Sequence, residues 1–137
     1  PVKWYAIGYG DEQTIRQAIE ECSMEEHFII LGKKANPYPY IAACDIYIQP
    51  SRYEGKAVTV REAQVLGKPV VITAFNTSAS QLMDGIDGII VPLSNEGAAE
   101  GIKALIEDKK LQEKLIANTA AGDYGNTKEI ERIYALL

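Results

Sequence analysis

Two glutamates eight residues apart, Glu54 and Glu62, are the residues of this sequence whose type and spacing most strongly suggest chemistry. They flank the start of a predicted helix in the segment E-G-K-A-V-T-V-R-E. The first amides of a helix have no partner within the helix and carry a partial positive charge, which favours a phosphate. The residues placed for such a role are Gly55, Lys56, Ala57 and Val58, and the lysine adds a cation of its own.

The positions of the two glutamates predict different roles for them. Glu62 lies about one turn into the helix, where its carboxylate can accept two hydrogen bonds from a ribose diol. Glu54 precedes the helix and would face a group bonded to the phosphate. The alternative is that the pair forms an ordinary helix-start charge and a solvated helix face, which is the commoner fate of glutamate. Residue types alone leave both interpretations open.

Strands and helices must alternate to position these residues. Short apolar or β-prone runs predict strands at residues 4–7, 28–31, 45–49, 70–73 and 89–91. The run at 28–31 is uninterrupted, which is typical of a strand buried on both faces. Helical patterns follow Asp11, cover 40–44, 58–66 and 77–83, and continue from a cap at Asn95 to the end of the chain. The sequence therefore predicts an α/β fold, a Rossmann-like parallel sheet with helices on both faces and a helical C-terminal tail.

Ligands of such sheets bind beyond the carboxyl ends of the strands, and polar or glycine-rich residues collect there in this sequence. The first strand ends in Gly8-Tyr9-Gly10, which could begin a dinucleotide-binding fingerprint. Gln13 stands where the third glycine would fall, and no acidic residue follows the next strand at the required distance. A nicotinamide enzyme is therefore not expected. The same turn could approach a phosphate, or it could simply pack a helix on a strand.

Composition excludes several classes of protein. Apolar residues make up 47% of the 137 residues and charged residues 24%, as in a globular domain. The net charge of -5, without a basic stripe, argues against general binding to nucleic acid or anionic lipid. No apolar run is long enough to span a membrane. Cys22, Cys44 and His27 lack metal-site spacing, so we expect no metal and two buried free thiols in a reducing cytoplasm.

A resemblance to a known family favours the chemical interpretation. Residues 50–56, followed by Glu62-Ala63 and by residues 67–71, resemble the E-x7-E region of the retaining glycosyltransferases of family four, also called group one. The similarity extends in order and spacing through residues 7–10, 31–32, 36–38, 44–47 and 85–92. It thus covers nearly the whole chain.

The resemblance implies that this chain is the C-terminal, donor-binding domain of a two-domain GT-B enzyme. In such a domain Glu62 would hold the ribose, and Glu54 would be the catalytic-site residue that contacts the transferred sugar. Amides from Lys56 to Val58 would bind the diphosphate, while the backbone at Leu31-Gly32 and the side chain of Tyr38 would flank the base. The remaining predicted donor-binding residues are Gly8, Gly10, Ser51 and Gly55.

Two positions depart from the family pattern. Many relatives have Phe-Gly where this chain has Lys56-Ala57, and the β-carbon of Ala57 limits how closely a phosphate can approach. Gln81 stands where many relatives carry a glutamate, and the sequence offers no interpretation of that difference. Neither change removes the pair of glutamates.

The expected function is transfer of a hexose from a nucleoside diphosphate donor, UDP first and GDP next, with retention of configuration and without a metal or cofactor. Residues 1–137 would form one domain that lacks its first strand-helix unit and the N-terminal domain through which a glycan or lipid-linked acceptor binds. We expect this chain alone to be inactive, and the full-length protein to be cytoplasmic or attached to the inner membrane face. The alternatives are a UDP-sugar epimerase of GT-B fold and a non-catalytic nucleotide-binding module.

Overall fold

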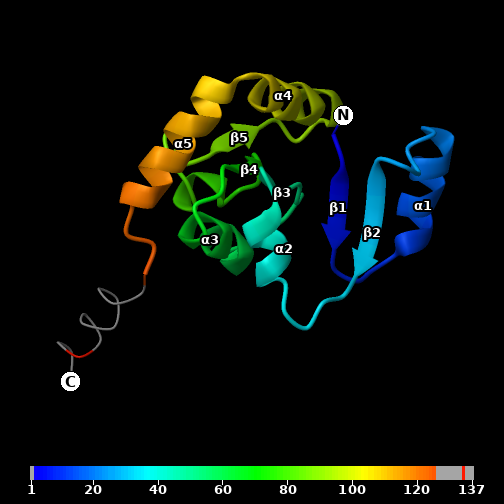
Figure 1. Cartoon of the computed structure of the whole chain (residues 1–137), viewed down its shortest axis with the longest axis horizontal. Helices are drawn as coiled ribbons and strands as arrows, with labels where there is room; N and C mark the ends of the chain where they lie inside the picture. The colour runs from blue at the N-terminus through cyan, green and yellow to red at the C-terminus, as the bar shows by residue number, and fades with distance from the viewer. Residues whose placement is uncertain (1, 126–133, 135–137) are drawn as a thin grey trace. The chain divides into compact units, whose positions relative to one another are not determined.

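The computed structural model describes residues 2–125 and 134, over which strands and helices alternate (Figure 1). The chain divides into two compact units, Pro1–Pro39 and Tyr40–Leu137, and each is described here by itself. The elements in chain order are β1 (Trp4–Ile7), α1 (Glu12–Glu21), β2 (Phe28–Gly32), α2 (Tyr38–Ala43), β3 (Tyr47–Gln49), α3 (Val58–Val65), β4 (Val70–Thr73), the 3-10 turn η1 (Ser78–Ser80), β5 (Ile89–Val91), α4 (Asn95–Glu107) and α5 (Lys109–Ala121).

The first unit contains a two-stranded parallel sheet of β1 and β2. Trp4 lies opposite Phe28 in the register, and their rings stack with centroids 5.7 Å apart. Every residue of β2 is only half-buried, so the prediction of a strand buried on both faces is wrong for this unit. The reason is that β2 pairs with β1 alone, and α1 buries none of its own residues. Cys22, which ends α1, is exposed rather than buried as predicted.

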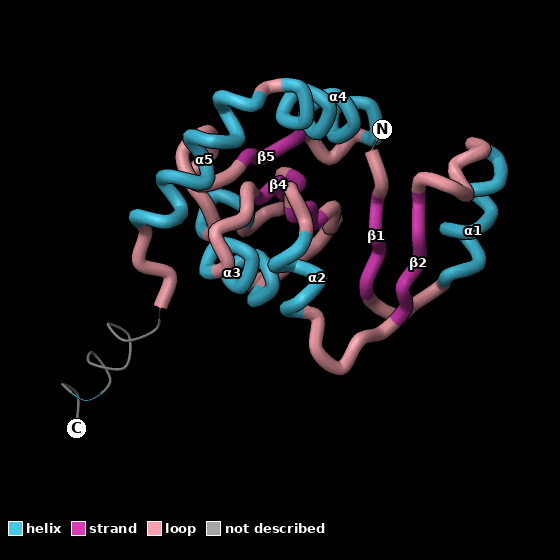
Figure 2. Tube along the Cα trace, in the orientation of Figure 1, coloured by secondary structure: helices cyan, strands magenta, loops and turns pink. Residues whose placement is uncertain are grey.

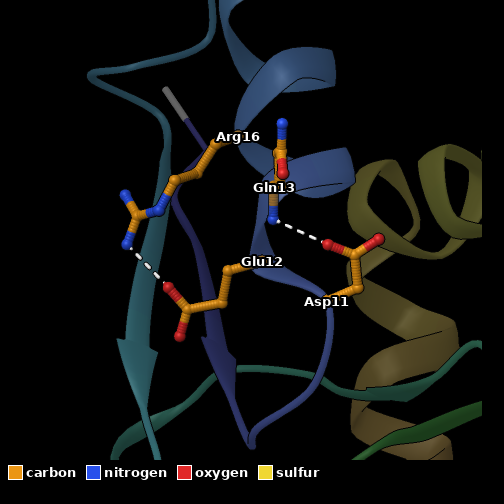
Figure 3. Close-up of polar contacts among 4 residues, drawn as sticks. All are labelled: Asp11, Glu12, Gln13 and Arg16. Carbon is orange, nitrogen blue, oxygen red and sulfur yellow. Dashed lines mark hydrogen bonds and ion pairs between the residues drawn. The ribbon is translucent and has the colours of Figure 1, made fainter.

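Helix α1 begins where the sequence predicts it, after Asp11 (Figure 3). The Asp11 carboxylate accepts a hydrogen bond from the Gln13 amide at 3.0 Å and another from the Thr14 hydroxyl at 2.7 Å. Both bonds satisfy groups at the helix start, as an aspartate cap should. One turn along the exposed face, Arg16 forms an ion pair with Glu12 at 2.8 Å. The start of α1 is therefore set by local side-chain chemistry.

The second unit contains a three-stranded parallel sheet in the order β3-β4-β5. All four residues of the central strand β4 are buried, and they alternate between two apolar clusters. Val70 and Ile72 pack with residues of α2 and α3, whereas Val71 packs with residues of α4 and α5. Helices thus cover both faces of this sheet, as predicted (Figure 2).

Most predicted element boundaries agree with the structure, and all strand pairs are parallel. The strands hydrogen-bond in two groups, β1-β2 and β3-β4-β5. The helix predicted over 77–83 is only the 3-10 turn η1. Helix α4 is capped by Ser94, whose hydroxyl accepts from the Gly97 amide at 3.1 Å, and not by Asn95.

Helices α4 and α5 confirm the helical C-terminal region as far as Ala121. The last helical stretch predicted from the sequence, up to Leu137, lies outside the described residues. None of the helices in the described ranges is both long and apolar enough to cross a membrane.

The packing of α3 predicts a contrast between two valines of the same helix. Val60 is 1% exposed and belongs to the core, whereas Val65 is 64% exposed. We expect Val60→Ala to lower the free energy of unfolding by about 2 kcal/mol, through lost burial plus the cavity left behind. Val65→Ala, the matched control, should change it by less than about 0.5 kcal/mol. Urea unfolding measures both, and equal effects would contradict the assigned packing of α3.

The Asp11 cap predicts a pH dependence. The Thr14 hydroxyl, followed by the backbone amides of Thr14 and Gln13, holds the pKa of Asp11 below its ordinary value of 3.8. The folded state therefore gains stability from this carboxylate above that value, and loses it as the pH falls through the lowered pKa. An NMR titration of the carboxyl carbon should find a midpoint below 3.8, and Thr14→Val should raise it. An unchanged midpoint in Thr14→Val would show that the hydroxyl is not the main cause.

Candidate functional site

The loop of residues 50–57 joins β3 to α3 and carries five of the predicted site residues, Ser51, Glu54, Gly55, Lys56 and Ala57. It begins at Pro50, which cannot donate a backbone hydrogen bond and so ends the strand. It ends at Ala57, the N-cap of α3, whose backbone is extended and whose side chain cannot cap the helix. The loop therefore depends on groups from elsewhere for its shape.

Three side chains, one from the last residue of β4 and two from the segment after it, hold this loop through hydrogen bonds. The Thr73 hydroxyl donates to the carbonyl of Ser51. The Thr77 hydroxyl donates to the carbonyl of Glu54 at 2.7 Å. The Gln81 side-chain oxygen accepts from the amide of Ala57 at 3.0 Å. We call Thr73, Thr77 and Gln81 the loop clamp, because each holds the backbone of a different part of the loop.

Gln81 joins two parts of the loop clamp. Its side chain is 5% exposed, and its amide nitrogen donates to the Thr77 hydroxyl at 3.3 Å while its oxygen receives the Ala57 amide. The glutamine thus satisfies the backbone amide of the N-cap residue, whose own side chain cannot cap the helix. The sequence analysis found no role for Gln81, although polar residues at 73, 77 and 81 recur at a spacing of four.

The bond to Gln81 changes the set of amides available to a phosphate. The Ala57 amide, predicted as a phosphate donor, already has an acceptor at 3.0 Å. Within the described part of the chain, neither the Lys56 amide nor the Val58 amide donates to another group. Both residues are exposed at the start of α3. Of the three amides predicted to bind a phosphate, those of Lys56 and Val58 therefore remain, together with the Lys56 side chain.

The Glu54 carboxylate is held at the edge of an open depression of about 280 Å³. Its Oε1 atom accepts from the Ser51 hydroxyl at 2.9 Å and from the Gln49 side-chain nitrogen at 3.1 Å. Ser51, predicted to touch a ligand, is thus a hydrogen-bond donor to Glu54. The depression is lined by Tyr53, Glu54, Gly55 and Asn76. Asn76 was not predicted, because it comes from the loop after β4 and is far from the motif in sequence.

The Tyr47 side chain lies close to both glutamates of the motif. Burial raises the pKa of its hydroxyl, and the negative charges of Glu62 and Glu54 raise it further. Glu62 is half-buried on α3, and Glu54 precedes that helix. Both carboxylates therefore lie near enough to the Tyr47 hydroxyl to act on its charge.

The other predicted residues belong to the first unit. Gly8 and Gly32 end β1 and β2, and the Gly8 amide donates to the Gly32 carbonyl at 3.2 Å. Both have positive φ angles, 152° and 68°, which favour glycine. Gly10 and Leu31 lie beside them, and the Tyr38 amide, at the start of α2, donates to Asn36 at 3.1 Å. The carboxyl ends of the two strands therefore meet at one edge, as predicted.

The two cysteines are free thiols in different settings. Cys44 is half-buried, and its thiol donates to the carbonyl of Ile41 at 3.1 Å. Burial raises the pKa of this thiol, which keeps it protonated and unreactive. Cys22 is exposed at the end of α1. Over residues 2–125 and 134, no group of three or more histidine, cysteine or carboxylate side chains could hold a metal ion.

Comparison with known proteins decides the family. The sequence pattern of the family described as "Glycosyl transferases group 1" matches residues 2–121. The chain belongs to this family. It is 32% identical over 114 residues, 80% of this chain, to N-acetylgalactosamine-N,N'-diacetylbacillosaminyl-diphospho-undecaprenol 4-alpha-N-acetylgalactosaminyltransferase of Campylobacter jejuni. It is 21% identical over 116 residues, 82% of this chain, to UDP-Gal:alpha-D-GlcNAc-diphosphoundecaprenol alpha-1,3-galactosyltransferase of Escherichia coli.

The fold also matches a solved glycosyltransferase structure. HepE of Anabaena, in complex with UDP-glucose, superimposes with a TM-score of 0.84 and 24% identity over 99% of this chain. The match confirms the α/β arrangement and its correspondence to the C-terminal half of a GT-B fold. The chain covers 31% and 30% of the two curated relatives and 41% of HepE. It therefore spans about a third of the length of the curated relatives that it matches.

The loop clamp predicts that Gln81 stabilises the second unit. Gln81→Leu keeps most of the side-chain volume but leaves the Ala57 amide without an acceptor. We expect a loss of about 1–3 kcal/mol in the free energy of unfolding, the usual penalty for such a group. Gln17→Leu, the same change at an exposed site on α1, is the control and should have little effect. If urea unfolding finds the two variants equally stable, the hydrogen bond does not hold the loop.

Proposed function

We propose that this chain binds the donor in a retaining glycosyltransferase that moves a hexose from UDP-hexose to a glycan or lipid-linked acceptor. Membership of the group 1 family supports transfer of a sugar. Two relatives are named for acceptors linked to undecaprenol diphosphate, and one of them is named for UDP-Gal as the donor. HepE holds UDP-glucose in a similar fold.

One observation of this structure carries the proposal. Glu54, whose carboxylate is oriented by Ser51 and Gln49, lines a depression together with Gly55, and the Lys56 and Val58 amides that follow in the chain have no acceptor among the described residues. At about 280 Å³ the depression is slightly below the range of ~300–1,000 Å³ usual for whole-ligand pockets. It fits one part of a nucleotide sugar.

In the proposed site each group meets one part of the donor. The diphosphate lies at the start of α3, against the Lys56 and Val58 amides and the Lys56 ammonium group. These donors stabilise the negative charge that grows on the diphosphate as the sugar departs. Glu54 faces the transferred sugar, and Glu62 accepts hydrogen bonds from the ribose. Because amides and a lysine neutralise the charge, we propose a mechanism without a metal or cofactor.

For the first unit we propose, from the family resemblance, that the turn Gly8-Tyr9-Gly10 and the backbone at Leu31-Gly32 bind part of a nucleotide and that Tyr38 flanks a base. We further propose a cytoplasmic location, because both cysteines are free thiols.

A nucleotide titration tests the assignment of Glu62. Calorimetry with UDP, GDP and ADP should find that UDP binds this chain, and more tightly than the other two. Glu62→Ala removes charge-assisted hydrogen bonds to the ribose, so the Kd should rise by about 10- to 100-fold. Glu113→Ala, at an exposed glutamate of α5, is the matched control and should leave the Kd unchanged. If no nucleotide binds, or if Glu62→Ala behaves as the control does, the donor site is wrongly placed.

A further inference from the structure

Gln49, the last residue of β3, lies outside the predicted site but contacts its central carboxylate. On one side, its side-chain oxygen accepts from the Tyr47 hydroxyl at 2.7 Å and from the Thr59 hydroxyl at 3.4 Å. On the other side, its side-chain nitrogen donates to the Ser51 hydroxyl at 3.0 Å and to Glu54 Oε1 at 3.1 Å. The carboxamide therefore connects the buried side of the strand end to the Glu54 carboxylate.

Only one orientation of this carboxamide suits its neighbours. An ionised carboxylate accepts hydrogen bonds and cannot donate them, so the nitrogen of Gln49 must face Glu54. The oxygen must then face Tyr47, which needs a protonated hydroxyl there. Burial raises the pKa of Tyr47, with Glu62 and Glu54 adding to the shift, so the hydroxyl remains a donor at neutral pH. The hydrogen bonds thus run in one direction, from Tyr47 through Gln49 to Glu54.

These contacts restrain a side chain that would otherwise rotate. The terminal torsion of a glutamate has a broad energy profile, so a carboxylate on a loop takes many orientations. Here Oε1 of Glu54 receives both the Ser51 and the Gln49 hydrogen bonds, at 2.9 and 3.1 Å. No hydrogen bond from the described residues reaches Oε2. That oxygen is left for a ligand.

We propose that Gln49 is a positioning residue for sugar transfer: its carboxamide, oriented by Tyr47, fixes the Glu54 carboxylate toward the transferred sugar. This inference rests on the proposed function of Glu54. It assigns to Gln49 an effect on the rate of transfer and not on the affinity for the nucleotide, because its contact with α3 is a long bond of 3.4 Å from the Thr59 hydroxyl and involves neither the Lys56 amide nor the Val58 amide.

The first test replaces Gln49 in the full-length enzyme. Gln49→Met keeps the length of the side chain but removes its hydrogen bonds, so kcat should fall by about 10- to 100-fold, as expected for a misplaced reacting group. The donor KM and the Kd for UDP should stay close to those of the wild type. Tyr47→Phe removes only the hydroxyl that orients the carboxamide, and it should lower kcat in the same sense but by less.

Gln64 provides a matched control. It is a glutamine of α3 that is 1% exposed and has no hydrogen-bond partner among the described residues. Gln64→Met makes the same chemical change in the same unit, away from Glu54. It should leave kcat unchanged, and circular dichroism melting should show that all three variants fold.

A second variant separates positioning from simple packing. Gln49→Glu has nearly the same shape, but when ionised it repels Glu54 and cannot donate to it; when protonated it donates as glutamine does. Tyr47 is the ionisable neighbour of this carboxamide, and among the described residues Glu62 on α3 and Cys44, which follows α2, act on Tyr47 together with Glu54. Relative to the wild type, the kcat of Gln49→Glu should therefore recover as the pH falls toward about 5, where a carboxyl beside another carboxylate takes up a proton. Gln49→Met should show no such recovery.

Each outcome has a definite meaning. A wild-type kcat in Gln49→Met overturns the inference, and so does a variant that loses UDP binding and kcat together, because that result indicates a structural role only. The same holds if Gln49→Glu and Gln49→Met respond alike to pH. If the wild-type full-length enzyme neither binds UDP nor transfers a sugar, the proposed function itself fails, and that result appears before any variant is made.

Discussion

The arrangement of the candidate site depends on the loop clamp, the hydrogen bonds from Thr73, Thr77 and Gln81 to the loop between β3 and α3. That loop has a proline at one end and an alanine cap at the other, so it cannot satisfy its own backbone. A buried amide without an acceptor is costly, and the clamp removes that cost at the start of α3. It can do so because β4 is fully buried, which fixes the position from which the clamp residues extend.

The loop clamp and the Gln49 carboxamide restrain different parts of the same loop. The clamp bonds backbone atoms of residues 51, 54 and 57, and so sets the path of the chain. Gln49 bonds the side chains of Ser51 and Glu54, and so sets the direction of one carboxylate. Transfer chemistry needs both, because a correctly placed loop with a freely rotating carboxylate would still present the charge in the wrong direction.

The hydrogen bond between Gln81 and the Ala57 amide also has an electrostatic consequence at the start of α3. In this chain the neutral side chain of Gln81 accepts a hydrogen bond from the Ala57 amide. A carboxylate at the same place would add negative charge at the positive end of α3. The neutral side chain leaves that end more favourable for an anion. Lys56 adds a positive charge beside it. The neutral Gln81 and the cationic Lys56 therefore act in the same electrostatic sense.

The sequence by itself determined the parallel α/β order, most strand positions and the start of α3 at Val58, because periodicity and turn residues act locally. The resemblance of its motifs, in order and spacing, indicated the family. It misjudged the burial of β2 and Cys22, which depends on which elements cover them. Only the tertiary structure decided that Gln81 occupies the Ala57 amide, that Asn76 lines the depression and that Gln49 orients Glu54. The first two join residues more than twenty positions apart, and the third depends on a side-chain orientation. The spacing of residues along the chain predicts neither such distant contacts nor the orientation of a side chain.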